Sequence, residues 1–397
     1  MNVAGIPERR AVWANAARIL CVRPDNLGDV VMTTPAFHAL KTSGPADRHL
    51  TLLTSHAGAI AQPHLSDIDD VIACDVPWAK HANAADAEQT TALIRTLREG
   101  AFDAAVIFTV HTQNPLPAAM LCFLAGIPLR LAHCRENPYA LLTDWIADAD
   151  ARIAATAPGD VRHEVRRQLD LVAQVVDTHA HLPQRLRFTV RAADRDAVRA
   201  KLAAHGIGPR TPWIVLHPGA TAASRRYPPE RFARIANVLA QRYDCPVLVT
   251  GAPGEAELVA QVCAPGQAAG RRVINLAGAL VLGELAALIE GAALLVSNNS
   301  GPVHLAAATQ TPVVDLYALT NPQHTPWAVP HAVLSHDVPC RYCYRSVCPL
   351  GHQACLTGVT EDEVIAATHA LWQPTRVAQA LWPALASPGS AAPTPVA

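Results

Sequence analysis

The chain has 397 residues, of which 50% are hydrophobic and 16% are charged, with a formal net charge of −1. This length fits two or three globular domains with large buried cores. The nearly neutral balance excludes a broad electrostatic surface for binding nucleic acid or for coating a membrane, so an anionic ligand must be bound locally.

The first 17 residues lack the long apolar segment and cleavage signal of a secretory leader. The best candidate for a membrane span, 279–296, is interrupted by Glu284 and Glu290. We therefore expect a cytoplasmic protein without a membrane-spanning helix. A peripheral contact with the inner face of the cytoplasmic membrane stays open.

Apolar runs alternate with helical stretches in the first part of the chain. Residues 18–22, 50–54 and 104–108 are rich in Val, Ile and Leu on both faces of the strands that they would form. Such strands, separated by helices, are typical of parallel sheets that are covered on both sides. The pattern predicts an α/β domain with a doubly wound, Rossmann-like arrangement.

A polar turn follows the first of these strands and leads into the helical run Val30–Phe37. Asp29 falls at or just inside the predicted start of the helix. The helix dipole favours an ionised carboxylate there, which would keep Asp29 competent as a base. Aspartate is also a common capping residue, so a purely structural role is the alternative.

A helix is predicted over His163–Val176, where apolar residues recur at helical spacing. Its arginines, Arg162, Arg166 and Arg167, are interpreted as a solvated face. The segment after this helix is the best domain boundary. We expect domains at 1–185 and 186–375, followed by a short helix and a disordered tail over 376–397.

The strand pattern starts again in the second domain, with runs at 213–217, 246–250, 293–297 and 312–316. Doubly wound domains bind ligands at the carboxyl ends of their strands. Two such domains facing each other would place these ends on opposite walls of a central cleft. That geometry suits an enzyme with two substrates.

Three turns of the second domain carry groups suited to a phosphate. Arg225 and Arg226 follow the strand 213–217, and guanidinium groups bind phosphate through paired hydrogen bonds. Thr250 and Gly251 end the next strand and either line a nucleotide site or cap a helix.

The segment Ser297–His304 is expected to form the third turn, between a strand and a helix. Gly301 permits a tight turn, and Pro302 suits the first helical position. The backbone N–H groups after Ser300 and the positive end of the helix dipole would favour a diphosphate. GxGxxG and GxxxxGK[ST] motifs are absent, so nicotinamide cofactors and P-loop nucleotide hydrolysis lose their usual signals.

Four of the ten cysteines lie close together near the end of the chain: Cys340, Cys343, Cys348 and Cys355. The first spacing is common in metal sites, whereas the later gaps are irregular for a zinc ribbon. A structural metal and plain reduced thiols both stay open. No catalytic role is expected for these thiols.

In the order and spacing of its motifs, the chain resembles glycosyltransferase family 9, the ADP-heptose:lipopolysaccharide heptosyltransferases and their relatives. The resemblance covers roughly residues 18–372. The motifs are Gly28-Asp29-Val30 with Thr34-Pro35, His217-Pro218-Gly219 with Arg226-Tyr227-Pro228, the segment Ser297–His304 and the cysteine-bearing end.

The resemblance implies a GT-B architecture and an inverting, metal-independent transfer of a sugar from a nucleotide diphosphate, with Asp29 as the base. Asn26 and Gly28 are placed beside Asp29 on the acceptor side. Arg225 falls where members carry a phosphate-binding lysine. Asn299 stands where many members have an aspartate that contacts the donor sugar, which puts a heptose donor in doubt.

On the donor side the resemblance also places a histidine at His304, near the helix start, where it either touches the phosphates or is structural. The donor-side set is completed by Arg226, Thr250, Gly251, Ser300, Gly301 and Pro302.

The sequence thus predicts a hexosyl- or heptosyltransferase (EC 2.4) that moves a sugar from a nucleotide-diphosphate donor to a lipid-linked or glycan acceptor, such as a lipopolysaccharide core. Catalysis would require no cofactor, and nucleic acid is not expected as a partner. The alternatives are a nucleotide-sugar epimerase or hydrolase on the same fold, and a non-catalytic protein that binds nucleotide sugars.

Overall fold

A computed structural model describes residues 6–79, 86–148, 161–178, 184–372 and 381–382. The chain divides into two compact units. The first comprises Met1–Thr189 together with the later segments Leu319–Ala328 and Cys340–Tyr344. The second comprises Val190–Ala318, Val329–Pro339 and Arg345–Ala397.

The first unit is built on a six-stranded parallel sheet with the strand order β3-β2-β1-β4-β5-β6. Its strands are β1 (Arg18–Arg23), β2 (His49–Thr54), β3 (Asp70–Ala73), β4 (Ala104–Ile107), β5 (Leu129–Cys134) and β6 (Asp144–Ala147). Ile19 in β1 pairs with Leu50 on one side and with Ala104 on the other. The central strands are buried on both faces, as their continuous apolar runs require.

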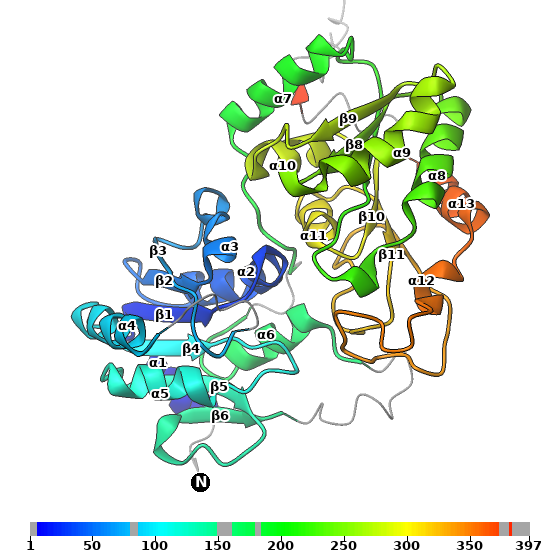
Figure 1. The fold of residues 1–397 in the computed structure, drawn as a ribbon. Coiled ribbons are helices and arrows are strands. Elements are labelled where there is room, and N and C mark those ends of the chain that lie inside the picture. The colour runs from blue at the N-terminus through cyan, green and yellow to red at the C-terminus, as the bar shows by residue number, and fades with distance from the viewer. Residues whose placement is uncertain (1–5, 80–85, 149–160, 179–183, 373–380, 383–397) are drawn as a thin grey trace, which may run out of the picture. The chain divides into compact units, whose positions relative to one another are not determined.

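Helices cover both faces of this sheet (Figure 1). They are α1 (Ile6–Trp13), α2 (Leu27–Thr42), α3 (His56–Ala59), α4 (Ala87–Glu99), α5 (Leu116–Leu124) and α6 (Glu164–Val172). Helix α2 continues through Pro35, which lacks the N–H group that would bond to the carbonyl of Val31. The hydroxyl of Thr34 donates to that carbonyl at 2.7 Å instead, so the helix is not interrupted.

The second unit repeats the plan with the strand order β12-β11-β10-β7-β8-β9. Its strands are β7 (Ile214–His217), β8 (Val247–Gly251), β9 (Val273–Ala277), β10 (Leu294–Asn298), β11 (Val313–Leu316) and β12 (His331–Leu334). Ser297 of β10 pairs with His217 of β7 and with Asp315 of β11. This register brings the carboxyl ends of three strands, and the turns that follow them, to one edge of the sheet.

The helices of the second unit also lie on both faces of its sheet (Figure 1). They are α7 (Ala192–Ala204), α8 (Pro229–Arg242), α9 (Ala256–Ala268), α10 (Leu282–Glu290), α11 (Gly301–Ala308), α12 (Ala354–Thr357) and α13 (Glu361–Leu371). The predicted α/β fold with two Rossmann-like sheets is confirmed.

Most of the predicted helix and tail over 376–397 lies outside the described residues. Leu381 and Trp382 are described, and both pack within the second unit. Leu381 is fully buried and its carbonyl accepts a hydrogen bond from Arg199 at 2.8 Å. The ring of Trp382 meets that of Trp213 edge to face, with centroids 6.2 Å apart.

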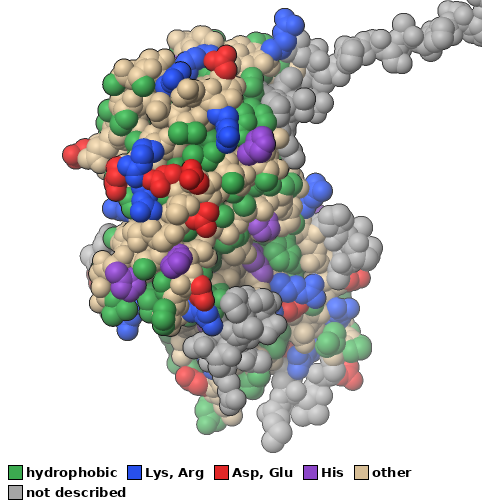
Figure 2. All heavy atoms as spheres, turned by 90° about the vertical axis from the view of Figure 1, so that its right-hand side faces the viewer, with side chains coloured by type: hydrophobic (Ala, Val, Ile, Leu, Met, Phe, Trp, Pro, Cys, Tyr) green, Lys and Arg blue, Asp and Glu red, His purple; other side chains and the backbone are tan. Residues whose placement is uncertain are grey.

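The surface charge and the helix lengths agree with the low net charge and the interrupted apolar runs of the sequence. The face drawn in Figure 2 carries basic and acidic side chains interspersed, without one large patch of a single sign. Within the described ranges, no helix has the length and apolar character needed to cross a membrane.

Candidate active site

A buried arginine lies at the carboxyl end of β1 in the first unit and contacts three carboxylates. The side chain of Arg23 is 0% exposed. Its Nε is 3.3 Å from Oδ2 of Asp25, and its Nη2 is 3.6 Å from Oδ1 of Asp29 and 3.0 Å from Oε1 of Glu164. One guanidinium therefore links the end of a strand to the first turn of α2 and to the first turn of α6.

Asp29 is the third residue of α2, whose N-cap is Asn26. Asp29 is therefore not the capping residue, and the capping role that the sequence left open for it is wrong. The Asp29 side chain is 19% exposed, in contrast to the fully buried Arg23 and Glu164. Asn26 and Gly28 occupy the same turn, so the three predicted residues of this motif stand together.

The other two carboxylates differ in their protonation. Burial raises the pKa of Asp25 to about 6, although Arg23 and a 2.6 Å hydrogen bond from Gln113 oppose the shift. Burial also disfavours the ionised form of Glu164, but the charges of Arg23 and Arg167 and a hydrogen bond from Gln168 lower its pKa to about 2. Glu164 is thus ionised at neutral pH, while Asp25 gains a proton just below neutral pH.

A second buried ion pair lies nearby, between Arg167 and Asp148. Nη2 of Arg167 is 2.9 Å from Oδ2 of Asp148, and the guanidinium also donates to the carbonyl of Thr109. The interpretation of the α6 arginines as a solvated face is wrong for Arg167, which is 0% exposed, whereas Arg166 is exposed. Helix α6 directs Arg167 toward the sheet, where the guanidinium pairs with the carboxylate of Asp148, the residue that follows β6.

At the carboxyl ends of the strands in the second unit, Asn298, the last residue of β10, connects three motifs. Its Oδ1 accepts a hydrogen bond from the backbone N–H of Tyr227 at 3.1 Å, and its Nδ2 donates to the carbonyl of Pro218 at 2.7 Å. Asn298 itself is fully buried. The His217-Pro218-Gly219 turn, the Arg226-Tyr227-Pro228 turn and the turn before α11 are therefore held together by one side chain that sequence reasoning did not single out.

The two adjacent arginines have different roles in the structure. Nε of Arg226 donates to the carbonyl of Ala220 at 2.7 Å, which fixes the loop after β7. Arg225 ends a short 3-10 turn, is half-buried, and its charge acts on Asp315. The Arg226 guanidinium is thus tied to the loop after β7, whereas that of Arg225 lies within electrostatic range of the β11 carboxyl group.

The turn before α11 joins a strand to a helix, as expected, but its backbone conformation differs from the tight glycine turn that was predicted. Ser300 is extended, with φ −152° and ψ −177°, and the helix begins directly at Gly301 with Pro302 in its first turn. Gly301 is not among the glycines with positive φ, so the turn does not need left-handed backbone there. His304 lies in the same helix and is buried.

The residues at the end of β8 are packed closely. The hydroxyl of Thr250 is 3.0 Å from Nδ1 of His217, and Thr250 is buried. Burial lowers the pKa of His217 to about 4, so the imidazole is neutral at physiological pH. A Cβ at Gly251 would approach the side chain of Val259 to 2.7 Å, which explains the glycine.

Asn299 reaches the neighbouring strand. Its Nδ2 donates to Oδ2 of Asp315 at 2.9 Å, and Asp315 is fully buried. Burial raises the pKa of Asp315 from its ordinary 3.8 to about 8, against the effects of Asn299 and Arg225. A carboxyl group therefore stands beside Asn299, contributed by β11, and it is largely protonated at neutral pH.

This shifted pKa predicts a pH-dependent stability. Folded Asp315 holds its proton more tightly than an unfolded aspartate, so the stabilisation is complete below the ordinary pKa and is lost as the pH rises toward about 8. Asp315→Asn should therefore leave Tm nearly unchanged at pH 4 and raise it, relative to the wild type, increasingly from pH 5 to pH 8. Thermal unfolding of both proteins across this range measures the difference; a constant difference would contradict the assigned protonation.

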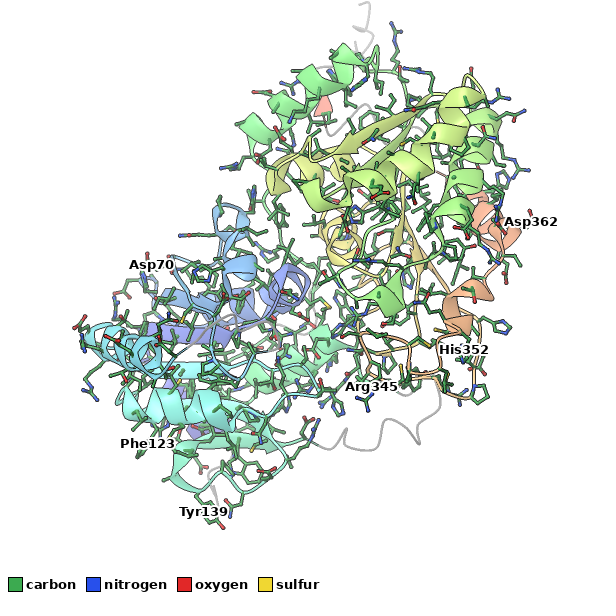
Figure 3. All side chains as sticks on the ribbon, viewed as in Figure 1. Asp70, Phe123, Tyr139, Arg345, His352 and Asp362 are labelled. Atoms are coloured by element: carbon green, nitrogen blue, oxygen red, sulfur yellow. The ribbon has the colours of Figure 1, made fainter. Side chains whose placement is uncertain are left out.

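The cysteine cluster near the end of the chain is divided between the two units. Where the chain is described, no group of three or more His, Cys, Asp or Glu side chains is arranged to hold a metal ion. Cys340 and Cys343 pack with the first unit, whereas Cys348 and Cys355 belong to the second. Arg345 and His352, which Figure 3 labels, lie in the loop before α12, and Cys348 stands between them in the sequence. Backbone N–H groups there, that of Gln353 above all, lower the pKa of the Cys348 thiol.

Comparison with known proteins identifies relatives of the whole fold. The sequence model of a protein family described as "Glycosyltransferase family 9 (heptosyltransferase)" matches residues 90–354. Lipopolysaccharide heptosyltransferase 2 of Salmonella typhimurium is 28% identical over 314 residues, which cover 78% of this chain and 85% of that protein.

Two solved structures share the fold. A family 9 glycosyltransferase from Veillonella parvula superposes with a TM-score of 0.73 at 22% identity, over 90% of this chain and 97% of the other. The E. coli ADP-heptose lps heptosyltransferase II superposes with a TM-score of 0.65 at 23% identity, over 89% and 98%. The two parallel sheets are thus GT-B-like, as in heptosyltransferase structures.

Proposed function

Because this chain belongs to glycosyltransferase family 9, and is therefore an enzyme of the heptosyltransferase type (EC 2.4), we propose that it transfers heptose from ADP-heptose to a lipopolysaccharide-core acceptor. The observation that carries the proposal is the partly exposed carboxylate of Asp29 beside the buried Arg23. The relatives named above add support, since their names specify heptose transfer and lipopolysaccharide.

In the proposed reaction, the Asp29 carboxylate accepts the proton of an acceptor hydroxyl. The hydroxyl oxygen then attacks the anomeric carbon of the donor from the side opposite the diphosphate, and the bond from that carbon to the phosphate oxygen breaks. The configuration at the carbon inverts. ADP leaves with the electron pair, and the proton remains on Asp29 until it passes to solvent.

We assign the departing diphosphate to the second unit. Arg225 supplies a positive charge, and α11 presents the positive end of its dipole and the N–H groups of its first turn. The neighbouring Asn299 would contact the donor sugar, and the fully buried, protonated Asp315 would orient the Asn299 amide. No metal ion is needed in this scheme because Arg225 and α11 neutralise the leaving group. A lipid-linked acceptor would place the enzyme peripherally at the cytoplasmic face of the membrane.

Binding of nucleotide sugars tests the donor assignment. ADP-heptose and ADP should raise Tm, whereas UDP-N-acetylglucosamine at the same concentration should not. A ligand at 100 times its Kd stabilises the folded protein by about 2.7 kcal/mol, which thermal unfolding detects readily. Stabilisation by the uridine nucleotide alone would contradict the proposed donor.

Arg225→Ala should weaken ADP binding about tenfold or more, because a charge-assisted contact with phosphate is lost. Titration calorimetry measures the Kd, and thermal unfolding should show little change. Arg234→Ala is a matched control, since Arg234 lies on α8 and pairs with the surface residue Glu361. Equal affinities of wild type and Arg225→Ala would remove Arg225 from the donor site.

A further inference from the structure

The ion pair between Arg23 and Glu164 lies entirely in the interior of the first unit. Both side chains are 0% exposed. In the described part of the chain, Oε2 of Glu164 has no hydrogen-bond partner. Replacing such a pair by apolar side chains of similar volume is often neutral or stabilising, so the presence of the pair is not explained by stability alone.

The pair connects Asp29 to a rigid part of the first unit. Nη2 of Arg23 lies 3.6 Å from Oδ1 of Asp29 and 3.0 Å from Oε1 of Glu164. Gln168, one turn further along α6, donates to the same Oε1 at 2.6 Å and to the carbonyl of Thr109 at 2.9 Å. The backbone N–H of Glu164 donates to the carbonyl of Gln323 at 3.0 Å. The same guanidinium nitrogen that contacts Asp29 is thereby held by a carboxylate that is itself anchored.

We propose that Arg23 and Glu164 are positioning residues that hold the Asp29 carboxylate in place and set its affinity for the acceptor proton. This inference rests on the proposed function, in which Asp29 is the base. Neither residue touches a substrate in this scheme, because both are fully buried; they act through Asp29.

The charges around Arg23 determine how each residue acts. Asp25 faces it from the loop after β1, Asp29 from α2 and Glu164 from α6, so one cation serves three carboxylates. The Arg23 cation favours ionised Asp29 and weakens it as a base. The Glu164 anion draws on the same cation and so raises the affinity of Asp29 for a proton. The two residues therefore oppose each other electrostatically.

This opposition gives a test that a merely structural role would not pass. In Arg23→Gln, the acidic limb of the pH profile of kcat/KM should move upward by about one pH unit or more, the range expected for loss of a nearby opposite charge. In Glu164→Gln, which keeps the shape of the side chain, the limb should move downward. The assay uses ADP-heptose with lipopolysaccharide core that lacks its outer heptose.

The kcat and the Kd for ADP are measured together with the pH profiles. In both variants kcat should fall more than tenfold, while the Kd for ADP changes less than twofold because the donor groups lie in the other unit. Arg48→Gln is the matched control: Arg48 is buried in the same unit, and among the described residues its guanidinium donates to the backbone carbonyls of 13, 14, 16 and 40 and to no side chain. Its variant should unfold at a lower temperature with an unshifted acidic limb.

The proposal would be overturned if Arg23→Gln and Glu164→Gln both fold and the acidic limbs of their pH profiles move in the same direction or do not move. If Arg23→Gln does not fold, the isosteric Glu164→Gln decides alone, since an unshifted limb there contradicts the inference. Normal turnover by Asp29→Asn would reject the proposed function itself. Loss of turnover in Asp29→Asn with unshifted limbs in the other variants would reject only the positioning roles.

Discussion

Asp29→Asn should lower kcat by at least about 100-fold, the usual contribution of a general base, while the Kd for ADP changes less than twofold. The amide keeps the size of the side chain and a contact with Arg23, but it cannot take the acceptor proton. The expected loss is confined to turnover because the donor groups belong to the second unit. Release of ADP in the presence of acceptor measures kcat, and calorimetry measures the Kd.

Asp70→Asn is the matched control, since Asp70 is exposed in β3 of the same unit, where it pairs with His49 (Figure 3). This variant should retain full activity. Turnover by Asp29→Asn within a few fold of the wild type would show that another group accepts the proton. The base would then have to be sought outside α2.

Asn298→Leu should destabilise the protein by about 2–4 kcal/mol, because two buried backbone groups lose their partners. The N–H of Tyr227 and the carbonyl of Pro218 both form a hydrogen bond with this amide. Because the position is fully buried, water cannot take the place of the amide in the variant. The affinity for ADP should fall as well, since the turns that carry Arg225 and the start of α11 lose their common anchor. Chemical denaturation and calorimetry measure the two effects.

Asn275→Leu provides the comparison, because Asn275 is exposed in β9 and its side chain accepts a local hydrogen bond from the N–H of Ala277, two residues further along. Its free energy of unfolding should change by less than about 1 kcal/mol. A similarly small change for Asn298→Leu would mean that the three turns are held by other contacts.

The fold could be predicted from the sequence because its signal is local and repeated. Runs such as 19–22 are apolar at successive positions, and only a strand covered on both faces buries all of them. The turn at Asn26 and the helix after it were visible for the same reason. The helix cap was not, since aspartate and asparagine are both favoured there and only the backbone geometry distinguishes them.

The contacts that organise the site could not be predicted, because they join residues far apart in the chain. Arg23 and Glu164 are separated by 141 positions, and Asn298 and Tyr227 by 71. A single sequence does not reveal such pairs. The charge on Arg167 was assigned to a solvated face because helical spacing alone does not show that Asp148 lies beneath it.

The contact between Asn299 and Asp315 was less hidden than these long-range pairs, although it was not visible from a local pattern either. The two residues are 16 positions apart, on adjacent strand ends, and the register pairs Ser297 with Asp315. Correct pairing of the two predicted strands would have placed them together. The departure from the family's aspartate at Asn299 is therefore accompanied by a carboxyl group from the next strand.

Mass spectrometry of the products tests the central claim most directly. The protein is incubated with ADP-heptose in the presence and absence of lipopolysaccharide core that lacks its outer heptose. We expect ADP and the heptosylated core in equal amounts, only when the acceptor is present, with the anomeric configuration inverted relative to the donor. Free heptose or an isomerised nucleotide sugar, formed without the acceptor, would contradict the account.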